Sequence, residues 1–326
     1  MCFPRWWARS KWAVTVASMT VIAMAVTGCG SSGSSSNGSK AYTIGFAPYN
    51  QTQAIFVQVA DYLKKTGAQD NAKVLVGDPN NDPTKQLQLI QTWLTTGLVN
   101  ALFILPLDPN ALDPVLEQAA SKNIPVVITG TPKVTRKGQV VITSDWHQYG
   151  LQAGTGLAQC INQRLGGQAK VAILGGPDLP GDVVTGRIQG EKDALAQMAP
   201  AAQIVAEQNG QGARLQSLQV MSTILRAHPE INAVTGTNDD SMIGVVNAFQ
   251  QAGKDPTKLC IVGLDATPEG LADVSSGTFY ATVDLNYLAY ASNGLKALTS
   301  MVRSTSSPYW SPPQTIVIPS VLKTRA

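Results

Sequence analysis

Short apolar runs alternate with longer amphipathic stretches along this chain, and the alternation restarts once. Strands of the first series are predicted at 42–47, 73–77, 101–105, 125–129 and 140–144. Helices are predicted between them at 51–66, 84–96 and 109–122, where apolar residues recur every three or four positions. Strands that alternate with helices form mostly parallel sheets covered by helices.

A second series follows the strand at 140–144. Its strands are predicted at 171–174, 203–207, 233–237, 259–263, 280–285 and 315–318, and its helices at 148–165, 184–198, 213–227, 240–252, 267–276 and 286–303. The series echo each other, since IGFAPY corresponds to AILGGP and PVVITG to IVGLDA. We therefore predict an α/β protein with two doubly wound parallel-sheet lobes. Ligands of such sheets bind beyond the carboxyl ends of the strands, so two facing lobes enclose a cleft.

Composition and charge narrow the classes of function. Hydrophobic residues make up 44% of the 326 residues and charged residues 14%, which is typical of a chain that forms a core. The net charge of +3 comes from Arg5, Arg9 and Lys11, because the chain after residue 28 carries as many acidic as basic residues. This balance argues against nucleic acid as a partner.

The chain offers little for catalysis or for a cofactor. His147 and His228 are its only histidines, which excludes a multi-histidine metal site and argues against a His-based catalytic centre. The glycine-rich pieces lack the residues of a phosphate loop and the spacing of a dinucleotide fingerprint. We therefore expect no metal, no cofactor and no enzyme activity.

The first forty residues predict export. Residues 1–11 are basic, and the apolar run at 12–26 is shorter than the about 20 residues of a membrane span but fits a secretory signal. The run ends in Val26-Thr27-Gly28-Cys29, which resembles a bacterial lipobox and implies cleavage before Cys29 and a diacylglycerol group on its sulfur. Under this interpretation 1–28 is the signal peptide and 29–40 a flexible Ser/Gly tether. An uncleaved anchor helix, the alternative, also gives an exported protein.

Several stretches in the rest of the chain resemble the periplasmic solute-binding proteins of the ribose type. They are NDPTKQLQLIQTWLTTGLVNALFILPLDPNAL (81–112), NIPVVIT (123–129), SDW (144–146), GGQAKVAILGGP (166–177), HPEINAVTGTNDD (228–240) and IVGLDATPEGLADVSSGTFYATV (261–283). The resemblance extends over about residues 42–323. It implies the type I periplasmic binding protein fold, with lobe one at 41–144 plus 286–318 and lobe two at 145–285 plus 319–326, joined by a hinge of three crossings.

The resemblance also implies a function. The chain would be the substrate-binding lipoprotein of an ABC importer, a monomer that captures a small uncharged sugar or polyol by hinge closure and passes it to an ABC permease. It would lie in the periplasm or on the outer face of the cytoplasmic membrane, attached to the membrane only through its lipid. The alternative is a sensory receptor that presents the bound solute to a membrane signalling partner. Lactose-repressor-type regulators share the fold but carry a helix-turn-helix where this chain has an export signal.

Ligand positions of the family map onto lobe one as follows. After the first strand, where the family has an Asn and stacking aromatics, this chain has Gln53 and Phe56, with Asn50 as a further candidate. At the end of the fourth strand an Asp-Arg pair of the family is replaced by Gly130-Thr131, so Thr131 is the candidate there. Phe56 as plain helix core is the alternative to its stacking role.

The remaining candidates lie in lobe two and at the crossings. Asp145 and Trp146 follow the first crossing, and Trp146 offers an aromatic platform for a sugar or packs in the hinge. Alignment on RIQGEKDAL places Thr185 at the family's ligand-binding Arg, with Arg187 a short step further along the helix. The other three candidates are Asn238 and Asp265, which end strands, and Asn286, beside the Leu285 that replaces a Gln of the family. Asn238 could instead cap the helix at 240–252, although Asp239 is the better predicted cap.

Cys160 and Cys260 stay in the exported chain, in an oxidising compartment. A disulfide between them and two buried free thiols are both compatible with the sequence. The fold implied by the resemblance places both cysteines at the end of lobe two away from the cleft, so a disulfide would not cross the hinge.

Overall fold

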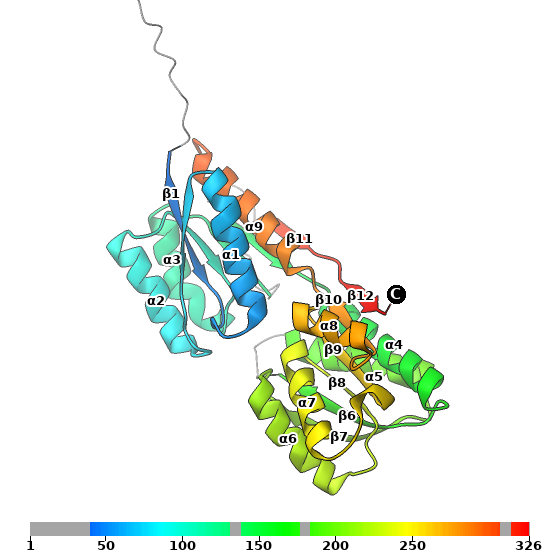
Figure 1. Cartoon of the computed structure of the whole chain (residues 1–326). Helices are drawn as coiled ribbons and strands as arrows, with labels where there is room; N and C mark the ends of the chain where they lie inside the picture. The colour runs from blue at the N-terminus through cyan, green and yellow to red at the C-terminus, as the bar shows by residue number, and fades with distance from the viewer. Residues whose placement is uncertain (1–39, 131–137, 177–182, 307–313, 326) are drawn as a thin grey trace, which may run out of the picture. The chain divides into compact units, whose positions relative to one another are not determined.

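In a computed structural model of the chain, the residues described are 40–130, 138–176, 183–306 and 314–325. Their strands form two six-stranded sheets (Figure 1). Sheet one consists of β1 (Tyr42–Ala47), β2 (Ala72–Val76), β3 (Ala101–Ile104), β4 (Val126–Thr129), β5 (Gln139–Thr143) and β11 (Gln314–Val317). Sheet two consists of β6 (Lys170–Gly175), β7 (Gln203–Asn209), β8 (Ala233–Gly236), β9 (Cys260–Leu264), β10 (Ala281–Asp284) and β12 (Val321–Thr324).

The two sheets have the same strand order. Sheet one runs β11-β5-β4-β3-β1-β2 and sheet two β12-β10-β9-β8-β6-β7. All pairs are parallel except β10 with β12, where Ala281 pairs with Thr324 and Asp284 with Val321 in antiparallel register. In each sheet the winding direction changes beside the first strand, between β1 and β3 and between β6 and β8. The predicted architecture of two doubly wound lobes is confirmed.

Helices cover both faces of sheet one. They are α1 (Ala54–Gln69), α2 (Pro83–Thr96), the 3₁₀ helix η1 (Pro109–Leu112), α3 (Asp113–Ser121) and α9 (Tyr287–Arg303). Side chains of β3 alternate between two hydrophobic clusters: Phe103 packs with residues of α1 and α9, and Leu102 and Ile104 pack with residues of α2 and α3. This two-sided burial explains why the strand is apolar at every position.

Sheet two is covered in the same way by its own helices. They are α4 (Trp146–Arg164), α5 (Val183–Met198), α6 (Arg214–Ala227), α7 (Asp239–Gln251), the 3₁₀ helix η2 (Pro256–Lys258) and α8 (Pro268–Ser276). Val171 and Ile173 of β6 pack with residues of α4 and α5, whereas Ala172 and Leu174 pack with residues of α6 and α7.

Two segments differ from the sequence prediction. The predicted helix over 109–122 is divided into η1 and α3, because Pro114 has no N–H to continue a helical ladder and fits the first turn of a new helix. The strand β12 was not predicted. It is a short edge strand whose side chains are exposed or half-buried, so it carries no apolar pattern.

The chain passes between the two sheets at three places. The connections are residues 144–145 between β5 and α4, 285–286 between β10 and α9, and 318–320 between β11 and β12. Ser144 ties these places together: its hydroxyl donates to the carbonyl of Ile318 at 2.7 Å and lies 2.7 Å from the hydroxyl of Tyr290 on α9.

Candidate functional site

The candidate site is a pocket at the carboxyl ends of the strands, with lining residues from both sheets. The space between its walls is about 820 Å³, part of it open to solvent. The elements of sheet one contribute Tyr49, Gln53, Phe56, Val59, Phe103, Leu105, Thr129, Gly130, Tyr287 and Tyr290. We call these residues the first wall. The elements of sheet two contribute Trp146, Gly176, Val183, Val184, Arg187, Gly212, Thr237, Asn238 and Asp265, which we call the second wall, and Leu285 lies at a crossing.

The loop before α1 and the first turn of this helix bring Gln53 and Phe56 to the pocket, as the resemblance implies. Asn50, the third candidate on this loop, is buried and does not line the pocket. Its side-chain oxygen accepts from the backbone N–H groups of Thr52 and Gln53, and its amide donates to Asn81. Asn50 therefore organises the loop from within, and α1 starts at Ala54 rather than at the predicted residue 51.

Arg187 is the main difference between the predicted and the observed site. It is the only buried cation among the residues that the structure describes. Its guanidinium lies 4.9 Å from the ring centres of both Trp146 and Tyr149, and one of its N–H groups donates to the carbonyl of Thr237 at 2.8 Å. Thr185 is exposed and does not line the pocket. Two residues along an α-helix correspond to about 200° of rotation, so only one of this pair can face the pocket.

Glycines set the position of Arg187. A Cβ atom at Gly150 of α4 would overlap the backbone of Arg187, and one at Gly190 of α5 would overlap the backbone of His147. The two helices therefore touch backbone to backbone. This contact holds Arg187 beside Trp146 and Tyr149, which are on the first turn of α4.

Asp265 follows β9 and lies at the second wall, as predicted. Its φ of 104° is unusual for a non-glycine residue, a conformation found most often at functional sites. The hydroxyl of Tyr149 donates to its Oδ1 at 3.0 Å, and that of Tyr287 lies at 3.5 Å from the same oxygen. Burial raises the pKa of Asp265 to about 7, although the nearby Arg187 and the Tyr149 hydroxyl act in the opposite direction.

Asn238 lines the pocket and also caps α7. Its Oδ1 accepts from the N–H of Ser241 at 2.9 Å, and its amide donates to the carbonyl of Gly212 at 2.8 Å. Asn238 is thus the cap, and the prediction that Asp239 caps this helix was wrong. Gln53 also donates to the Gly212 carbonyl, at 3.3 Å, so residues of both walls meet at that atom.

Asp239 lies behind the pocket rather than in it. It is fully buried, and its carboxylate accepts from the N–H and the hydroxyl of Thr267 and from the hydroxyl of Thr282. Burial, with the nearby Asp265 as second cause, raises its pKa to about 8. Glu191 of α5 is buried as well, and burial raises its pKa well above the usual value.

Two predicted ligand residues cap helices instead of lining the pocket. Asp145 is exposed, and its carboxylate accepts from the N–H of Gln148 at the start of α4. Asn286 is exposed as well, and its Oδ1 accepts from the N–H of Ala289 at the start of α9. Each cap starts a helix whose next residue, Trp146 or Tyr287, does line the pocket. At the first crossing the lining residue, Trp146, was also predicted, whereas at the second crossing it is Tyr287, one residue after the predicted Asn286.

Several lining residues were not predicted. They are Val59, Phe103, Leu105, Thr129, Gly176, Val183, Val184, Thr237, Tyr287 and Tyr290. Phe103 and Leu105 belong to the apolar strand and its end, and their spacing of two places them on the same face. Tyr287 and Tyr290 lie one turn apart on α9 and have ring centres 5.9 Å apart. Helical spacing could have indicated the pair, but not which way it faces.

Two predicted residues, Thr131 and Cys29, lie outside the described residues, as do the segments 1–28 and 29–39. Gly130, next to Thr131, lines the pocket, and its carbonyl accepts from the indole N–H of Trp146 at 3.1 Å. Within the described ranges no helix is long and apolar enough to cross a membrane. The same ranges contain no group of three His, Cys, Asp or Glu residues that could hold a metal ion.

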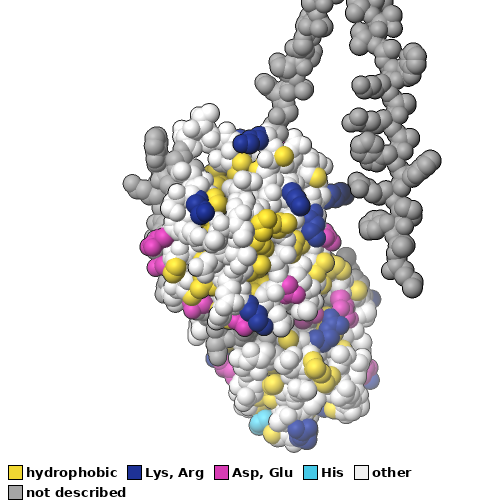
Figure 2. Space-filling model, turned by 90° about the vertical axis from the view of Figure 1, so that its left-hand side faces the viewer, with side chains coloured by type: hydrophobic (Ala, Val, Ile, Leu, Met, Phe, Trp, Pro, Cys, Tyr) yellow, Lys and Arg dark blue, Asp and Glu magenta, His cyan; other side chains and the backbone are white. Residues whose placement is uncertain are grey.

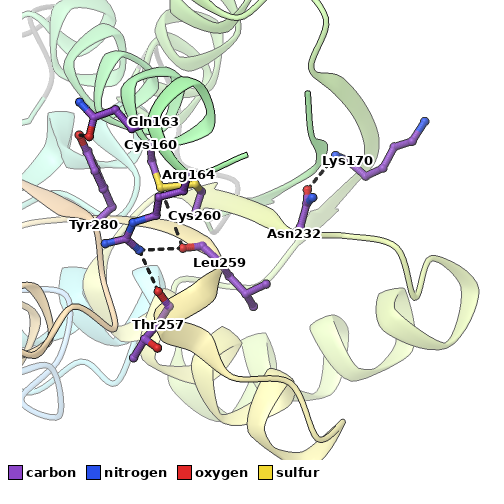
Figure 3. Close-up of a disulfide and its surroundings, with 9 residues drawn as sticks. All are labelled: Cys160, Gln163, Arg164, Lys170, Asn232, Thr257, Leu259, Cys260 and Tyr280. Atoms are coloured by element: carbon purple, nitrogen blue, oxygen red, sulfur yellow. Dashed lines mark hydrogen bonds between the residues drawn. A yellow bond between two sulfur atoms is a disulfide. The ribbon is translucent and has the colours of Figure 1, made fainter. Parts of the chain in front are cut away.

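A disulfide joins Cys160 of α4 to Cys260 of β9 (Figure 3). Arg164 lies beside it: its guanidinium donates to the carbonyls of Thr257 and Leu259 and lies 5.3 Å from the ring centre of Tyr280. The pocket is at the other end of both elements, since Trp146 is on the first turn of α4 and Asp265 follows β9.

On the face shown in Figure 2, Lys and Arg side chains are interspersed with Asp and Glu side chains. This distribution agrees with the charge balance of the sequence and offers no broad basic patch on that face.

Comparison with known proteins identifies the family. Residues 44–306 match the family described as the periplasmic binding protein domain. The chain belongs to this family. It is 30% identical over 245 residues to the ribose import binding protein RbsB of Bacillus subtilis, which covers 75% of this chain and 76% of the relative. It is 28% identical over 235 residues to the xylitol-binding protein of Mycolicibacterium smegmatis, which covers 72% of this chain and 65% of that protein.

Solved structures agree with this assignment. A Mycobacterium smegmatis protein in complex with β-D-fucofuranose has a TM-score of 0.74 and 26% identity, over 87% of this chain and 91% of the other. An ABC transporter periplasmic solute binding protein from Actinobacillus succinogenes, with bound D-allose, has a TM-score of 0.74 and 24% identity. The match covers 87% of this chain and 97% of the other. The present periplasmic binding protein is thus a ribose-type solute-binding protein and not an enzyme.

Proposed function

We propose that this periplasmic binding protein captures a small uncharged sugar or polyol in the pocket between its two sheets. The observation that carries the proposal is that Arg187 and Asp265 line the same pocket together with several aromatic rings. Arg187 supplies hydrogen-bond donors, and Asp265 together with Asn238 supplies acceptors. A pocket of this kind offers both donors and acceptors, as hydroxyl groups require, and no excess charge for a phosphate or a carboxylate.

The aromatic side chains support a carbohydrate-like solute. Phe56, Trp146, Tyr287 and Tyr290 line the pocket, and aromatic faces pack well against the C–H faces of a sugar ring. The relatives are consistent with this class, since their names refer to ribose import and to xylitol.

The hinge would close around the solute. The connections at 144–145, 285–286 and 318–320 are short, and Ser144 joins the first to the third. A solute that contacts both walls favours the closed arrangement by its additional contacts. Small-angle X-ray scattering should therefore show a smaller radius of gyration at saturating solute.

Export, lipidation and transport complete the proposal. The Val26–Cys29 pattern supports a lipid-anchored protein, and the name of the ribose import relative supports delivery to an ABC permease. The mass of the mature amino-terminal peptide should include a diacylglycerol on Cys29, and Cys29→Ala should release the protein from the membrane fraction. Deletion of the gene should abolish uptake of the labelled solute.

A thermal-shift screen tests the solute class. The purified full chain, in mild detergent, is heated with pentoses, hexoses, sugar alcohols and inositols, and with amino acids as controls. A solute that binds only the folded state adds about 2.7 kcal/mol of stability at a hundredfold excess over its Kd, which raises the midpoint by several degrees. Asp265→Ala should abolish the shift, whereas Asp61→Ala, an exposed residue of α1, should leave it intact. Shifts with amino acids alone would contradict the proposal.

A further inference from the structure

The two walls of the pocket differ in chemistry. The second wall carries Arg187, Thr237, Asn238 and Asp265, whereas the part of the first wall formed by α1 and β3 carries almost only hydrocarbon. A solute in this pocket therefore meets polar groups on one edge and apolar groups on the opposite edge.

The polar edge contains hydrogen-bond donors that have no partner within the described part of the chain. The Nε of Arg187 and the hydroxyl of Thr237 are buried and have no hydrogen-bond partner among the described residues. The side chains of Arg187 and Thr237 are 7% and 3% exposed, so little water reaches them from elsewhere. Buried polar atoms of this kind are costly unless a ligand satisfies them. Together with the carboxylate of Asp265, they provide a site for hydroxyl groups.

The apolar edge is continuous. Phe56 and Val59 lie one turn apart on α1, and Phe103 and Leu105 lie two residues apart at the end of β3. All four are 6% exposed or less and belong to the same hydrophobic cluster. No side-chain oxygen or nitrogen belongs to these four residues, so none of their side chains can bond a hydroxyl group.

Among the polar residues of the first wall, Tyr49 packs against the apolar edge through its ring, whose centre lies 5.3 Å from that of Phe56. Tyr49 and Thr129 are beside Gly130, at the end of β4, and the Tyr49 hydroxyl would lie 3.6 Å from a Cβ atom at Gly130. Gln53 donates to the carbonyl of Gly212, and the Tyr290 hydroxyl is 2.7 Å from that of Ser144.

We propose that the solute is a deoxysugar, or another polyol with a methyl or methylene edge, whose hydroxyls face Arg187 and Asp265 and whose apolar edge faces Val59, Phe103 and Leu105. This inference rests on the proposed function, because it specifies the solute within the class of sugars and polyols. A hydroxyl placed against these side chains would lose its bonds to water and gain none. An apolar pocket rejects an added hydroxyl by about tenfold to a hundredfold.

Matched pairs of solutes provide the test. Isothermal titration calorimetry on the full chain compares D-galactose with 6-deoxy-D-galactose, D-mannose with 6-deoxy-D-mannose, D-ribose with 5-deoxy-D-ribose, and myo-inositol with its mono-O-methyl ethers. In at least one pair we expect the deoxy or methylated member to bind about tenfold more tightly, or better, than its hydroxylated parent.

A variant pair tests the wall itself. Val59→Thr replaces a methyl group with a hydroxyl of nearly the same size, which can bond a hydroxyl of the solute. In the best pair, the ratio of the affinity for the deoxy or methylated solute to that for its hydroxylated parent should therefore fall about threefold or more. Val57→Thr makes the same change on the same helix, at a side chain that is 38% exposed and not in the pocket, and should leave the preference unchanged.

The outcomes separate this inference from the proposed function. If sugars or polyols bind but the fully hydroxylated members bind equally well or better, the inference is wrong and the proposed function stands. An unchanged preference in Val59→Thr would also contradict the inference. If no sugar or polyol binds, the proposed function fails and the inference fails with it.

Discussion

Gly150 of α4 lies directly against the peptide backbone of Arg187 on α5, leaving no room for a Cβ atom. The contact joins the amino-terminal parts of the two helices, and both residues are buried. It positions the cation of the pocket, because Arg187 can lie over Trp146 and Tyr149 only if the two helices approach this closely. Gly150 does not line the pocket, but its contact with α5 holds in place a residue that does.

Gly150→Ala should destabilise the protein by about 1–3 kcal/mol, because the added methyl group forces the helices apart. It should also weaken solute binding, since Arg187 moves with α5. Thermal unfolding followed by circular dichroism and calorimetric titration measure the two effects. The control is Gly156→Ala on the same helix, where the added atom meets side-chain carbons of Leu322 and Ala281 instead of backbone. Equal stability losses in both variants would contradict this explanation.

Arg187→Lys should lower the affinity for the solute at least about tenfold, which corresponds to about 1.4 kcal/mol. Lysine keeps the charge but lacks the planar guanidinium that lies over two rings and donates to the Thr237 carbonyl. Arg164→Lys is the matched control, because Arg164 also contacts a ring and backbone carbonyls but lies beside the disulfide. Unchanged affinity in Arg187→Lys would exclude the guanidinium from solute binding.

The disulfide should contribute to stability without contributing to binding. Its two cysteines are 100 residues apart in sequence, and loss of a cross-link over such a span costs about 2–5 kcal/mol. Cys160→Ala with Cys260→Ala should therefore unfold at a lower temperature and bind the solute with unchanged affinity, since Cys160 is about 20 Å along α4 from Trp146. A reducing agent should lower the midpoint of the native protein but not that of the double variant.

Stability should fall as the pH rises from about 4 to about 8. Folded Asp239 keeps its proton up to about pH 8, whereas the unfolded chain loses it near pH 4. The folded state binds the extra proton in this window, so this carboxyl lowers the free energy of unfolding by up to about 1.4 kcal/mol for each unit that the pH rises. Asp265, with its pKa raised to about 7, adds to the same trend.

Asp239→Asn should flatten this pH dependence. The amide oxygen of Asn can still accept from the N–H and the hydroxyl of Thr267, as Oδ2 of Asp239 does, but the Asn side chain has no group that titrates in this range. Chemical denaturation at pH 5, 6, 7 and 8 measures the slope for both proteins. A slope that is the same in Asp239→Asn would mean that this carboxyl is ionised in the folded protein.

The local pattern of apolar and polar residues was enough to predict most of the strands and helices. Nearly every strand and helix lies within a few residues of its prediction, because burial on both faces makes each strand an apolar run and each helix amphipathic. The exceptions have local causes: Pro114 interrupts one helix, and β12 is an exposed edge strand. Asp265 could be predicted at the pocket because it directly follows a buried parallel strand, at the edge of the sheet where ligands bind, and because the resemblance implies a ligand residue there.

Helix caps and helix rotation limited the prediction of the site. Asp145 and Asn286 were plausible ligand residues, but each hydrogen-bonds the first turn of the following helix instead. Asn238 lines the pocket and caps a helix at once, which no sequence pattern distinguishes. Thr185 and Arg187 are two residues apart, and only the packing of α5 on α4 decides that Arg187 faces the pocket.

The sequence by itself determined the two-lobed α/β architecture and the edge of each sheet where a solute binds, because these depend on periodicity and strand order. The tertiary structure alone decided which side chains form the walls, which carboxyls are buried, and where the pocket is apolar. Those properties depend on contacts between residues far apart in the chain, such as Gly150 with Arg187 and Tyr149 with Asp265. Such contacts produce no repeating pattern in the sequence from which they could be predicted.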